Sequence, residues 1–305
     1  MKKFLCLALI AAVTAIIFSS CNKDDDIVAD TGANTGSNIA GTDFTVVEYL
    51  PAPGQFINEK VSGFDNVTTM EAACEYAAGR LGSNLFVSLG SWGGYIVVKA
   101  GAAIPNTGGY DFSIAGNSFD SSNEAGIVWV MQDTNGNGLP DDTWYELRGS
   151  YYGMEGYERD YSVTYFRPDG AGDVRWKDSR GEEGVVKWMG QFHAQNYYPG
   201  WVTADSYTLK GTRLPSLAYQ DEAGVWINPP FGWGYADNSG EDSEIITIEG
   251  KTIQKNFFRI SDAIDASGGS VDLDGIDFIK VQTAVNGTSG VIGENSTEVC
   301  GFFRP

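Results

Sequence analysis

Residues 126–147 read GIVWVMQDTNGNGLPDDTWYEL, and this stretch decides the fold class of the chain. Its two ends are short runs of β-branched and aromatic residues, which is the composition of β-strands. Its middle consists mainly of Asp, Asn, Gly and Pro, which favour turns and loops. We therefore predict a β-hairpin in which an acidic loop joins two strands.

The same alternation between strand-like runs and turn residues continues along most of the chain. One segment differs, because TTMEAACEYAAGRLG has helical composition, a capping-box spacing from Thr68 to Glu71 and a stop at Gly82. The sequence therefore predicts an all-β fold, a β-sandwich with a jelly-roll-like arrangement as one form of it, and one short helix near residues 68–81. Further strand-like runs occupy residues 44–50, 85–90, 94–100, 110–116, 161–168, 244–250 and 276–285.

The acidic loop DTNGNGLPDD, residues 133–142, has the spacing of a calcium-binding loop. Alternate oxygen-bearing side chains in a tight loop converge on one point, Gly138 allows the bend, and such a set of oxygens suits Ca²⁺. An EF-hand carries a Glu at the twelfth position, where this chain has Trp144, and strands flank the loop in place of helices. We predict a structural Ca²⁺ that pins the hairpin, with an acidic turn without metal as the alternative. The predicted metal ligands are Asp133, Asn135, Asn137, Leu139 through its carbonyl, Asp141 and Asp142.

Aromatic residues are concentrated in the middle of the chain, where seven of the eight tryptophans lie between Trp129 and Trp233. Two loop-like segments, QFHAQNYYPGW (191–201) and NPPFGWGYADN (228–238), carry several of them. Exposed aromatic faces bind sugar rings or a large macrocycle, and packing in the core is the alternative. The predicted ligand-binding residues are Tyr197, Tyr198, Trp201, Phe231, Trp233 and Tyr235.

Motifs of known catalytic centres are absent from the sequence. It contains neither a zinc-binding motif nor a G-x-S-x-G elbow, and its single histidine, His193, reads as a hydrogen-bonding loop residue. We therefore expect a non-catalytic ligand-binding protein. Two alternatives stay open: a glycan-active hydrolase or lyase with paired carboxylates, since Asp and Glu total 40, and a structural or adhesion module without a small ligand.

The first 20 residues, MKKFLCLALIAAVTAIIFSS, predict a signal peptide, because a basic start precedes an apolar run too short for a membrane span. The residues up to Cys21 resemble the lipobox of bacterial lipoproteins, although Phe18 stands where Leu is usual. We therefore expect a lipid on Cys21. The following Lys23 and three aspartates resemble the export signal of Bacteroidetes surface lipoproteins, which implies exposure on the outer face of the outer membrane. A solvated charge run is the alternative.

The composition of the chain changes near residue 42 and divides an expected tether from an expected folded domain. Residues 21–42 are polar and rich in Gly, Asn, Asp and Thr, so we expect a disordered tether that carries the lipid. Residues 43–305 then form a single calcium-stabilised β-sandwich domain. The formal net charge of −20 argues against nucleic acid and against docking on anionic lipid, which leaves the lipid anchor as the membrane contact.

Two cysteines remain after the predicted signal peptide and the lipidated residue are set aside. These are Cys74 and Cys300. An oxidising compartment permits a disulfide between them. Two buried thiols are the alternative, because cysteine often acts as a small apolar residue.

Several segments together resemble a group of bacterial cell surface proteins. They are FVSLGSWGGYIVV (86–98), YDFSIAGNSF (110–119), the stretch 125–147, the aromatic middle, IDFIKVQT (276–283) and GENSTEV (293–299). The resemblance covers roughly residues 45–303. Members in Bacteroidetes are lipoproteins, often with PKD-type domains where this chain has a short tether, and they resemble accessory lipoproteins of outer-membrane TonB-dependent receptors. The resemblance implies a surface lipoprotein that binds a cobamide, a glycan or a surface and assists outer-membrane uptake with such a receptor as partner.

Overall fold

A computed structural model describes residues 36–248, 250–288 and 293–305 of the chain. The predicted signal peptide, Cys21 and most of the predicted tether lie outside these residues. Strands dominate, and the described ranges contain a single α-helix, α1 (Met70–Gly82), which confirms the predicted all-β class and the short helix. No helix in the described ranges is long and apolar enough to cross a membrane.

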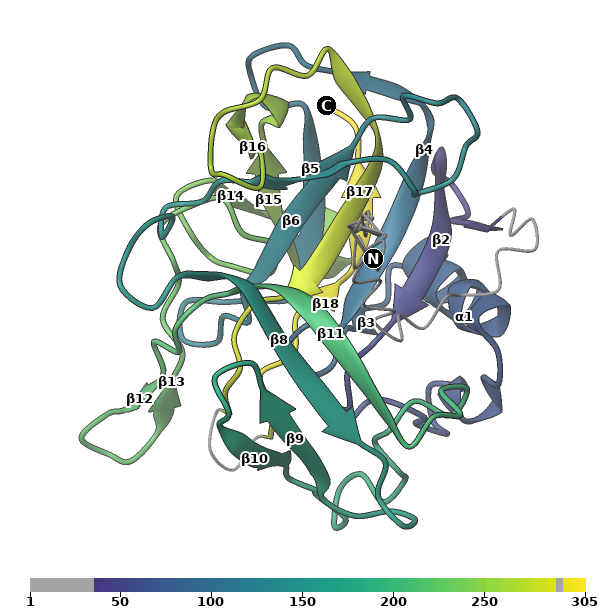
Figure 1. Cartoon of the computed structure of the whole chain (residues 1–305), viewed down its shortest axis with the longest axis vertical. Helices are drawn as coiled ribbons and strands as arrows, with labels where there is room; N and C mark the ends of the chain where they lie inside the picture. The colour runs from purple at the N-terminus through teal and green to yellow at the C-terminus, as the bar shows by residue number, and fades with distance from the viewer. Residues whose placement is uncertain (1–35, 249, 289–292) are drawn as a thin grey trace, which may run out of the picture. The chain divides into compact units, whose positions relative to one another are not determined.

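The largest sheet among the described residues has seven strands in the order β1-β2-β4-β17-β6-β7-β16. β17 pairs antiparallel with both β4 and β6, so a late strand fills the centre of a sheet built from early ones (Figure 1). The strands are β1 (Ser37–Asn38), β2 (Phe44–Leu50), β4 (Tyr95–Pro105), β6 (Gly126–Met131), β7 (Trp144–Leu147), β16 (Ala263–Ile264) and β17 (Gly275–Thr283).

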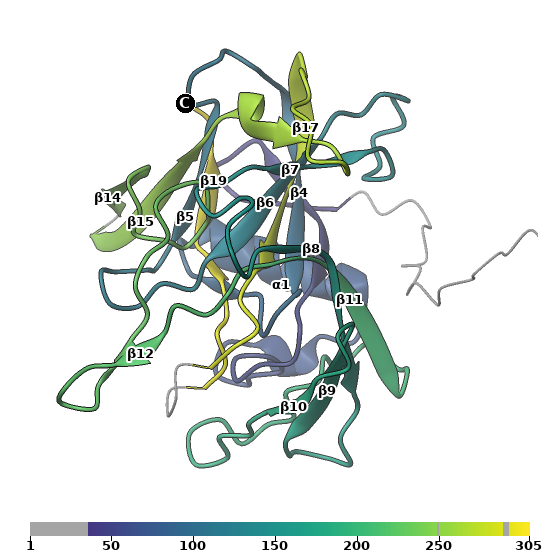
Figure 2. The same ribbon diagram turned by 60° about the vertical axis from the view of Figure 1, so that its left-hand side comes forward.

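A second sheet in the described part of the chain has the order β14-β15-β5-β19 and forms the other layer of a sandwich (Figure 2). Its strands are β5 (Phe112–Gly116), β14 (Ser243–Ile248), β15 (Lys251–Phe258) and β19 (Gly301–Phe303). Side chains from both sheets and from α1 share the main apolar cluster, in which the rings of Phe44 and Phe302 lie 5.9 Å apart. This shared cluster confirms the predicted β-sandwich.

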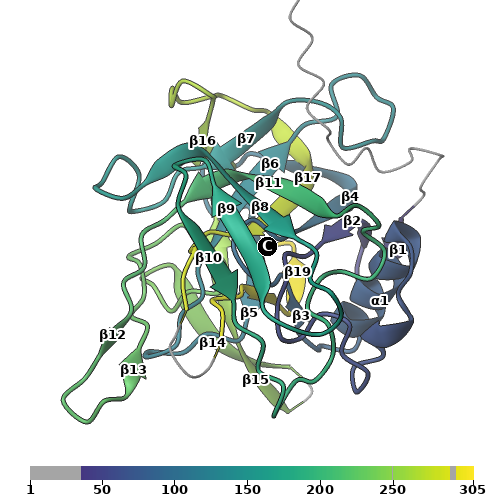
Figure 3. The ribbon, with the colours of Figure 1, turned by 60° about the horizontal axis from the view of Figure 1, so that its bottom comes forward.

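A third sheet within these ranges has the strand order β10-β9-β8-β11 (Figure 3). Its buried apolar side chains share a separate apolar cluster with Trp92. Along β8, Tyr161, Val163 and Tyr165 are buried while their neighbours are half-exposed or exposed, as expected for a sheet with one face in water. The strands are β8 (Glu158–Phe166), β9 (Val174–Asp178), β10 (Glu183–Val186) and β11 (Ser206–Arg213).

Short elements complete the described structure. β3 (Val87–Ser88) pairs with β18 (Glu298–Val299), and β12 (Tyr219–Gln220) pairs with β13 (Trp226–Ile227). Two 3-10 turns, η1 (Phe64–Asn66) and η2 (Ile260–Asp262), precede α1 and β16. The helix begins one residue later than the capping-box spacing predicted, because Thr69 is the N-cap, and its hydroxyl accepts from Ala72 N at 3.1 Å.

Candidate functional site

The predicted calcium loop joins β6 to β7, which pair antiparallel and so confirm the predicted hairpin. Glycines at 136 and 138 have positive φ, 71° and 76°, a conformation that glycine adopts without strain. Backbone N–H groups bind the predicted ligand side chains in turn and curl the loop. Gly138 N donates to Asp133 Oδ2 (2.8 Å), Asn137 N to Asn135 Oδ1 (2.9 Å) and Leu139 N to Asn137 Oδ1 (2.7 Å).

The loop holds one side-chain oxygen that a cation could engage. Asp133 Oδ1 is buried and has no hydrogen-bond partner among the described residues. The Asp141 carboxylate accepts from the side-chain amides of Asn135 at 3.2 Å and Asn137 at 2.9 Å, so these three predicted ligands lie together. Asp142 instead accepts from Thr134 N at 3.0 Å and fastens one end of the loop to the other. Ca²⁺ prefers about six to eight oxygen ligands, and the Asp133 oxygen supplies one that nothing else engages.

Four of the six predicted ligand-binding aromatics belong to the core. Tyr197, Tyr198, Phe231 and Tyr235 are each at most 5% exposed, so their faces are not offered to a ligand. The tyrosine hydroxyls bond to the backbone, for example Tyr197 with Met189 N at 2.9 Å. For these four residues, the prediction of ligand contact is corrected in favour of core packing. Their segments lack regular structure but fold back onto apolar clusters, which sequence patterns do not reveal.

The two remaining loop aromatics are partly exposed. Trp201 packs against the main cluster, with its ring 5.7 Å from that of Phe64. Trp233 lies at the wall of a pocket of about 250 Å³. Trp233 is therefore a predicted ligand-binding aromatic residue that lines a concave surface.

Side chains from well-separated segments line this pocket. They come from residue 110 before β5, from the end of β7, from the 233–242 loop and from the region where β15 leads into η2. Arg148 Nη2 lies 3.8 Å from Asp262 Oδ1, and the Arg259 guanidinium lies 4.4 Å from the centre of the Tyr110 ring. The lining thus combines aromatic walls with a few charged groups.

Asp242 is the buried charged group of the pocket and is 7% exposed. Its Oδ2 accepts from Gly234 N at 2.7 Å, whereas its Oδ1 has no hydrogen-bond partner in the described part of the chain. Burial raises the pKa of Asp242 to about 6, although the Gly234 N–H and the nearby Asn256 amide oppose the rise. The side chain is therefore mainly ionised at neutral pH, and its Oδ1 is enclosed in the protein without a hydrogen bond of normal geometry from the described residues.

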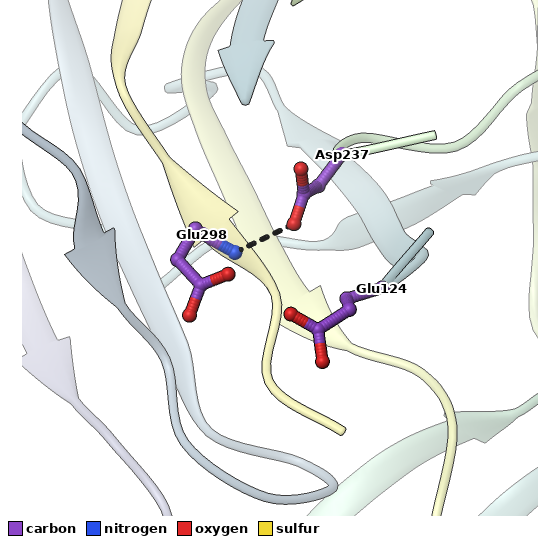
Figure 4. A group of neighbouring side chains, drawn as sticks. All are labelled: Glu124, Asp237 and Glu298. Carbon is purple, nitrogen blue, oxygen red and sulfur yellow. Dashed lines mark hydrogen bonds between the residues drawn. The ribbon is translucent and has the colours of Figure 1, made fainter. Parts of the chain in front are cut away.

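A second group of acidic side chains comes together near β18 (Figure 4). Glu124, Asp237 and Glu298 each place an oxygen within 4.8 Å of the others. Asp237 and Glu298 are buried, and Glu124 is half-buried. The three residues are far apart in sequence and belong to no motif of known spacing, so sequence reasoning did not find them.

Backbone donors hold this acidic cluster in place. Asp237 Oδ1 accepts from Asn117 N (3.0 Å) and Ser118 N (2.9 Å), and its Oδ2 accepts from Glu298 N (2.9 Å). Glu124 Oε1 accepts from Ser296 N at 3.1 Å. The acidic cluster is therefore fixed by the main chain of two separate segments.

Burial raises the pKa of Glu124 to about 8 and that of Asp237 to about 7, and it holds the pKa of Glu298 well above its usual range. Nearby carboxylates raise the pKa values of Glu124 and Glu298 further, because like charges repel in a low-dielectric interior, whereas backbone hydrogen bonds oppose the rise at Asp237. At neutral pH the acidic cluster shares protons, and a bound cation could take their place. These oxygens could thus hold a metal ion, and nothing in the geometry selects Ca²⁺.

The structure also shows the surroundings of the two cysteines and the histidine singled out in the sequence. Cys74 lies on the buried face of α1 in the main cluster, and Cys300 is buried in another cluster with Ala115 and Ile253. The structure therefore supports two buried thiols over the disulfide. His193 Nδ1 lies 3.1 Å from Glu59 Oε1, in keeping with a hydrogen-bonding loop residue.

Neither protein-family models nor curated proteins match this chain. The resemblance to bacterial cell surface proteins therefore stays a prediction.

Proposed function

We propose that this protein is a non-catalytic surface lipoprotein that captures a small extracellular nutrient in the pocket beside Trp233. The observation that carries the proposal is the pocket itself. Small-molecule sites are concave and combine apolar walls with placed polar groups, and this pocket is a concave site in which aromatic walls and charged side chains both line the space. The orphan oxygen of Asp242 adds a polar group that a ligand would satisfy.

The pocket and the burial of the acidic cluster favour nutrient capture over adhesion and over glycan hydrolysis. An adhesion module works through a broad surface and needs no pocket with a buried carboxylate. A glycosidase needs two carboxyl groups on opposite sides of a bond that water or a nucleophile can reach. The acidic cluster offers carboxyl groups, but two of its three members are at most 4% exposed.

The location, the metal and the partner complete the proposal. A lipid on Cys21 would hold the protein at the outer membrane, facing the cell exterior, and a TonB-dependent receptor would accept the captured nutrient. A structural Ca²⁺ in the loop between β6 and β7 would keep the hairpin closed. The unengaged Asp133 oxygen supports this ion.

The experiment that tests capture compares thermal unfolding with and without candidate nutrients. It uses the chain from Asn22 onward, since the first core residue in the described structure is Ile39. A nutrient that binds only the folded state raises the unfolding midpoint. We expect Trp233→Ala to abolish that rise while leaving the ligand-free midpoint within a few degrees of wild type. Turnover of labelled polysaccharides, or no rise with any nutrient, would contradict the proposal.

A further inference from the structure

We propose that the pocket beside Trp233 binds a neutral sugar ring, either as a free monosaccharide or as the terminal ring of a glycan. The inference rests on the proposed capture function and names the class of its ligand. Four properties of the pocket carry it: size, charge balance, an unmet hydrogen bond and aromatic walls.

The size of the pocket limits the ligand. Its volume is about 250 Å³. Sites for drug-sized ligands occupy roughly 300–1,000 Å³, so a single sugar ring fits this space. A cobamide, whose macrocycle is larger than a drug-sized molecule, would reach only the rim.

The charge balance disfavours an ionic ligand. Two guanidinium groups, Arg148 and Arg259, line the pocket together with three carboxyl groups, from Glu241, Asp242 and Asp262. The carboxylates would repel an anion, and the guanidinium groups would repel a cation. Because Arg148 and Asp262 already lie 3.8 Å apart, part of this charge is compensated within the protein. A neutral ligand therefore suits the pocket best.

The unmet hydrogen bond requires a donor from the ligand. Asp242 Oδ1 is buried and accepts from no group in the described residues. Because this oxygen is enclosed by the lining, a ligand O–H reaches it only when the lining shifts, and it then recovers the roughly 1–3 kcal/mol that an unpaired buried acceptor costs. Arg148, with a side chain 42% exposed, supplies donors at the same pocket. A sugar hydroxyl both donates and accepts, so adjacent hydroxyls can serve the carboxylate and the guanidinium together.

The aromatic walls match the apolar side of a sugar ring. Trp233 and Phe257 are partly exposed and line the pocket, and buried Phe258 and Leu147 complete its apolar part. A pyranose presents C–H groups on its faces, and aromatic rings pack against such surfaces. The pocket thus offers both kinds of contact that a sugar ring uses.

The test is calorimetric titration of the chain from Asn22 onward with glucose, galactose, mannose, xylose and N-acetylglucosamine. Glucuronic acid and glucosamine serve as charged analogues, and oligosaccharides ending in the bound sugar separate a free ligand from a glycan end. We expect at least one neutral sugar to bind at least tenfold more tightly than its charged analogue. Trp233→Ala and Asp242→Asn should each weaken binding about tenfold or more, the scale of one hydrogen bond to a charged group. Phe192→Ala, which truncates a 76% exposed ring that does not line the pocket, should leave affinity unchanged.

The outcomes separate this inference from the capture proposal. Cobalamin and an amino acid mixture are titrated in parallel. If one of them binds in a Trp233-dependent manner and no sugar does, the sugar inference is overturned and capture stands. Sugar binding that survives both pocket substitutions also overturns the inference. If no compound binds, both proposals fail. If the Asp242→Asn variant does not fold, Trp233→Ala still tests the inference. Trp233 is partly exposed, so its truncation leaves the core intact.

Discussion

At the scale of single residues, the buried carboxyl groups govern how this protein responds to pH. Folding raises the pKa of Glu124 to about 8 and that of Asp237 to about 7, while the same groups in an unfolded chain titrate near 4. The folded state therefore binds more protons than the unfolded state between these values. Burial of Glu294, whose pKa rises to about 7, acts in the same direction.

We predict that stability falls as the pH rises from 5.5 to 8.5. A group with a raised folded pKa contributes its full stability below the unfolded pKa and loses it as the pH passes the folded pKa. The loss should be on the order of a few kcal/mol, since one pKa unit corresponds to about 1.4 kcal/mol. Urea unfolding in the presence of a chelator measures it, and the chelator removes cations that would compete for the same oxygens. A flat or rising profile would contradict the assignment.

Two isosteric substitutions in the acidic cluster should have opposite effects at pH 8.5. Glu124→Gln removes the buried Glu124 charge with its repulsion from Asp237 and keeps an acceptor for Ser296 N, so we expect a higher melting temperature. Asp237→Asn turns an amide NH₂ toward a backbone donor and should cost about 1–3 kcal/mol. Thermal unfolding followed by circular dichroism measures both. Equal losses in the two variants would show that charge repulsion is unimportant.

At the scale of single elements, the hairpin from β6 to β7 depends on its loop. The loop forms from residues close in sequence, which is why DTNGNGLPDD could be assigned without a structure. Side chains at alternate positions cap backbone N–H groups, and this pattern follows directly from the spacing of Asp and Asn. The position of Asp142, which binds Thr134, could not be predicted because either aspartate satisfies the spacing.

We predict that chelation of calcium lowers the melting temperature and that Asp133→Ala abolishes this calcium-dependent part. The reason is that the ion, by binding only the folded loop, stabilises the folded state. Thr134→Val serves as the control: it removes the hydroxyl that donates to Asp142 and should lower the melting temperature by a similar amount with and without calcium. A melting temperature insensitive to chelator would leave the loop as an acidic turn.

The loop aromatics mark the limit of sequence reasoning at this scale. Trp233 and Tyr235 are two residues apart, yet one lines the pocket and the other is 0% exposed. Composition treats them alike, because burial of a loop is set by distant segments that pack on it. The Tyr235 hydroxyl is satisfied by Tyr151 N at 3.1 Å, a partner that only the tertiary fold supplies.

We predict that Tyr235→Ala destabilises the protein by about 3–5 kcal/mol, as expected for removal of a buried aromatic ring. Trp233→Ala, its partly exposed neighbour, should cost less than half as much. Urea unfolding midpoints of the two variants provide the measurement. Equal costs would show that Trp233 belongs to the core and would weaken its role in the pocket.

At the scale of the whole molecule, strand patterns predicted the sandwich but not its assembly. The runs at 126–133 and 276–285 could be recognised separately, yet nothing local indicated that β6 and β17 are neighbours. The acidic cluster is a result of this assembly, since Glu124, Asp237 and Glu298 meet only when three distant segments pack. Sites of this kind require the fold.

Deletions at the C-terminus test how far the stability of the sandwich depends on its last strand, β19. Deletion of Gly301–Pro305 removes β19 from the second sheet and takes Phe302, 1% exposed, from the main cluster. We expect this variant not to fold cooperatively. Deletion of only Arg304 and Pro305 keeps β19 and loses an exposed ion pair with Asp43, so it should cost under about 1 kcal/mol. Near-ultraviolet circular dichroism distinguishes the two variants. A native spectrum for the variant that lacks Gly301–Pro305 would contradict the prediction.

The place of β17 between β4 and β6 also bears on the moment at which the chain can fold. A polypeptide that emerges amino terminus first, from a ribosome or through a membrane, exposes β4 and β6 more than 100 residues before Thr283 arrives to join them. Until then the central sheet lacks its middle strand, and contacts of such sequence separation form slowly. The strand order therefore delays assembly of the central sheet until β17, in the last fifth of the sequence, has emerged.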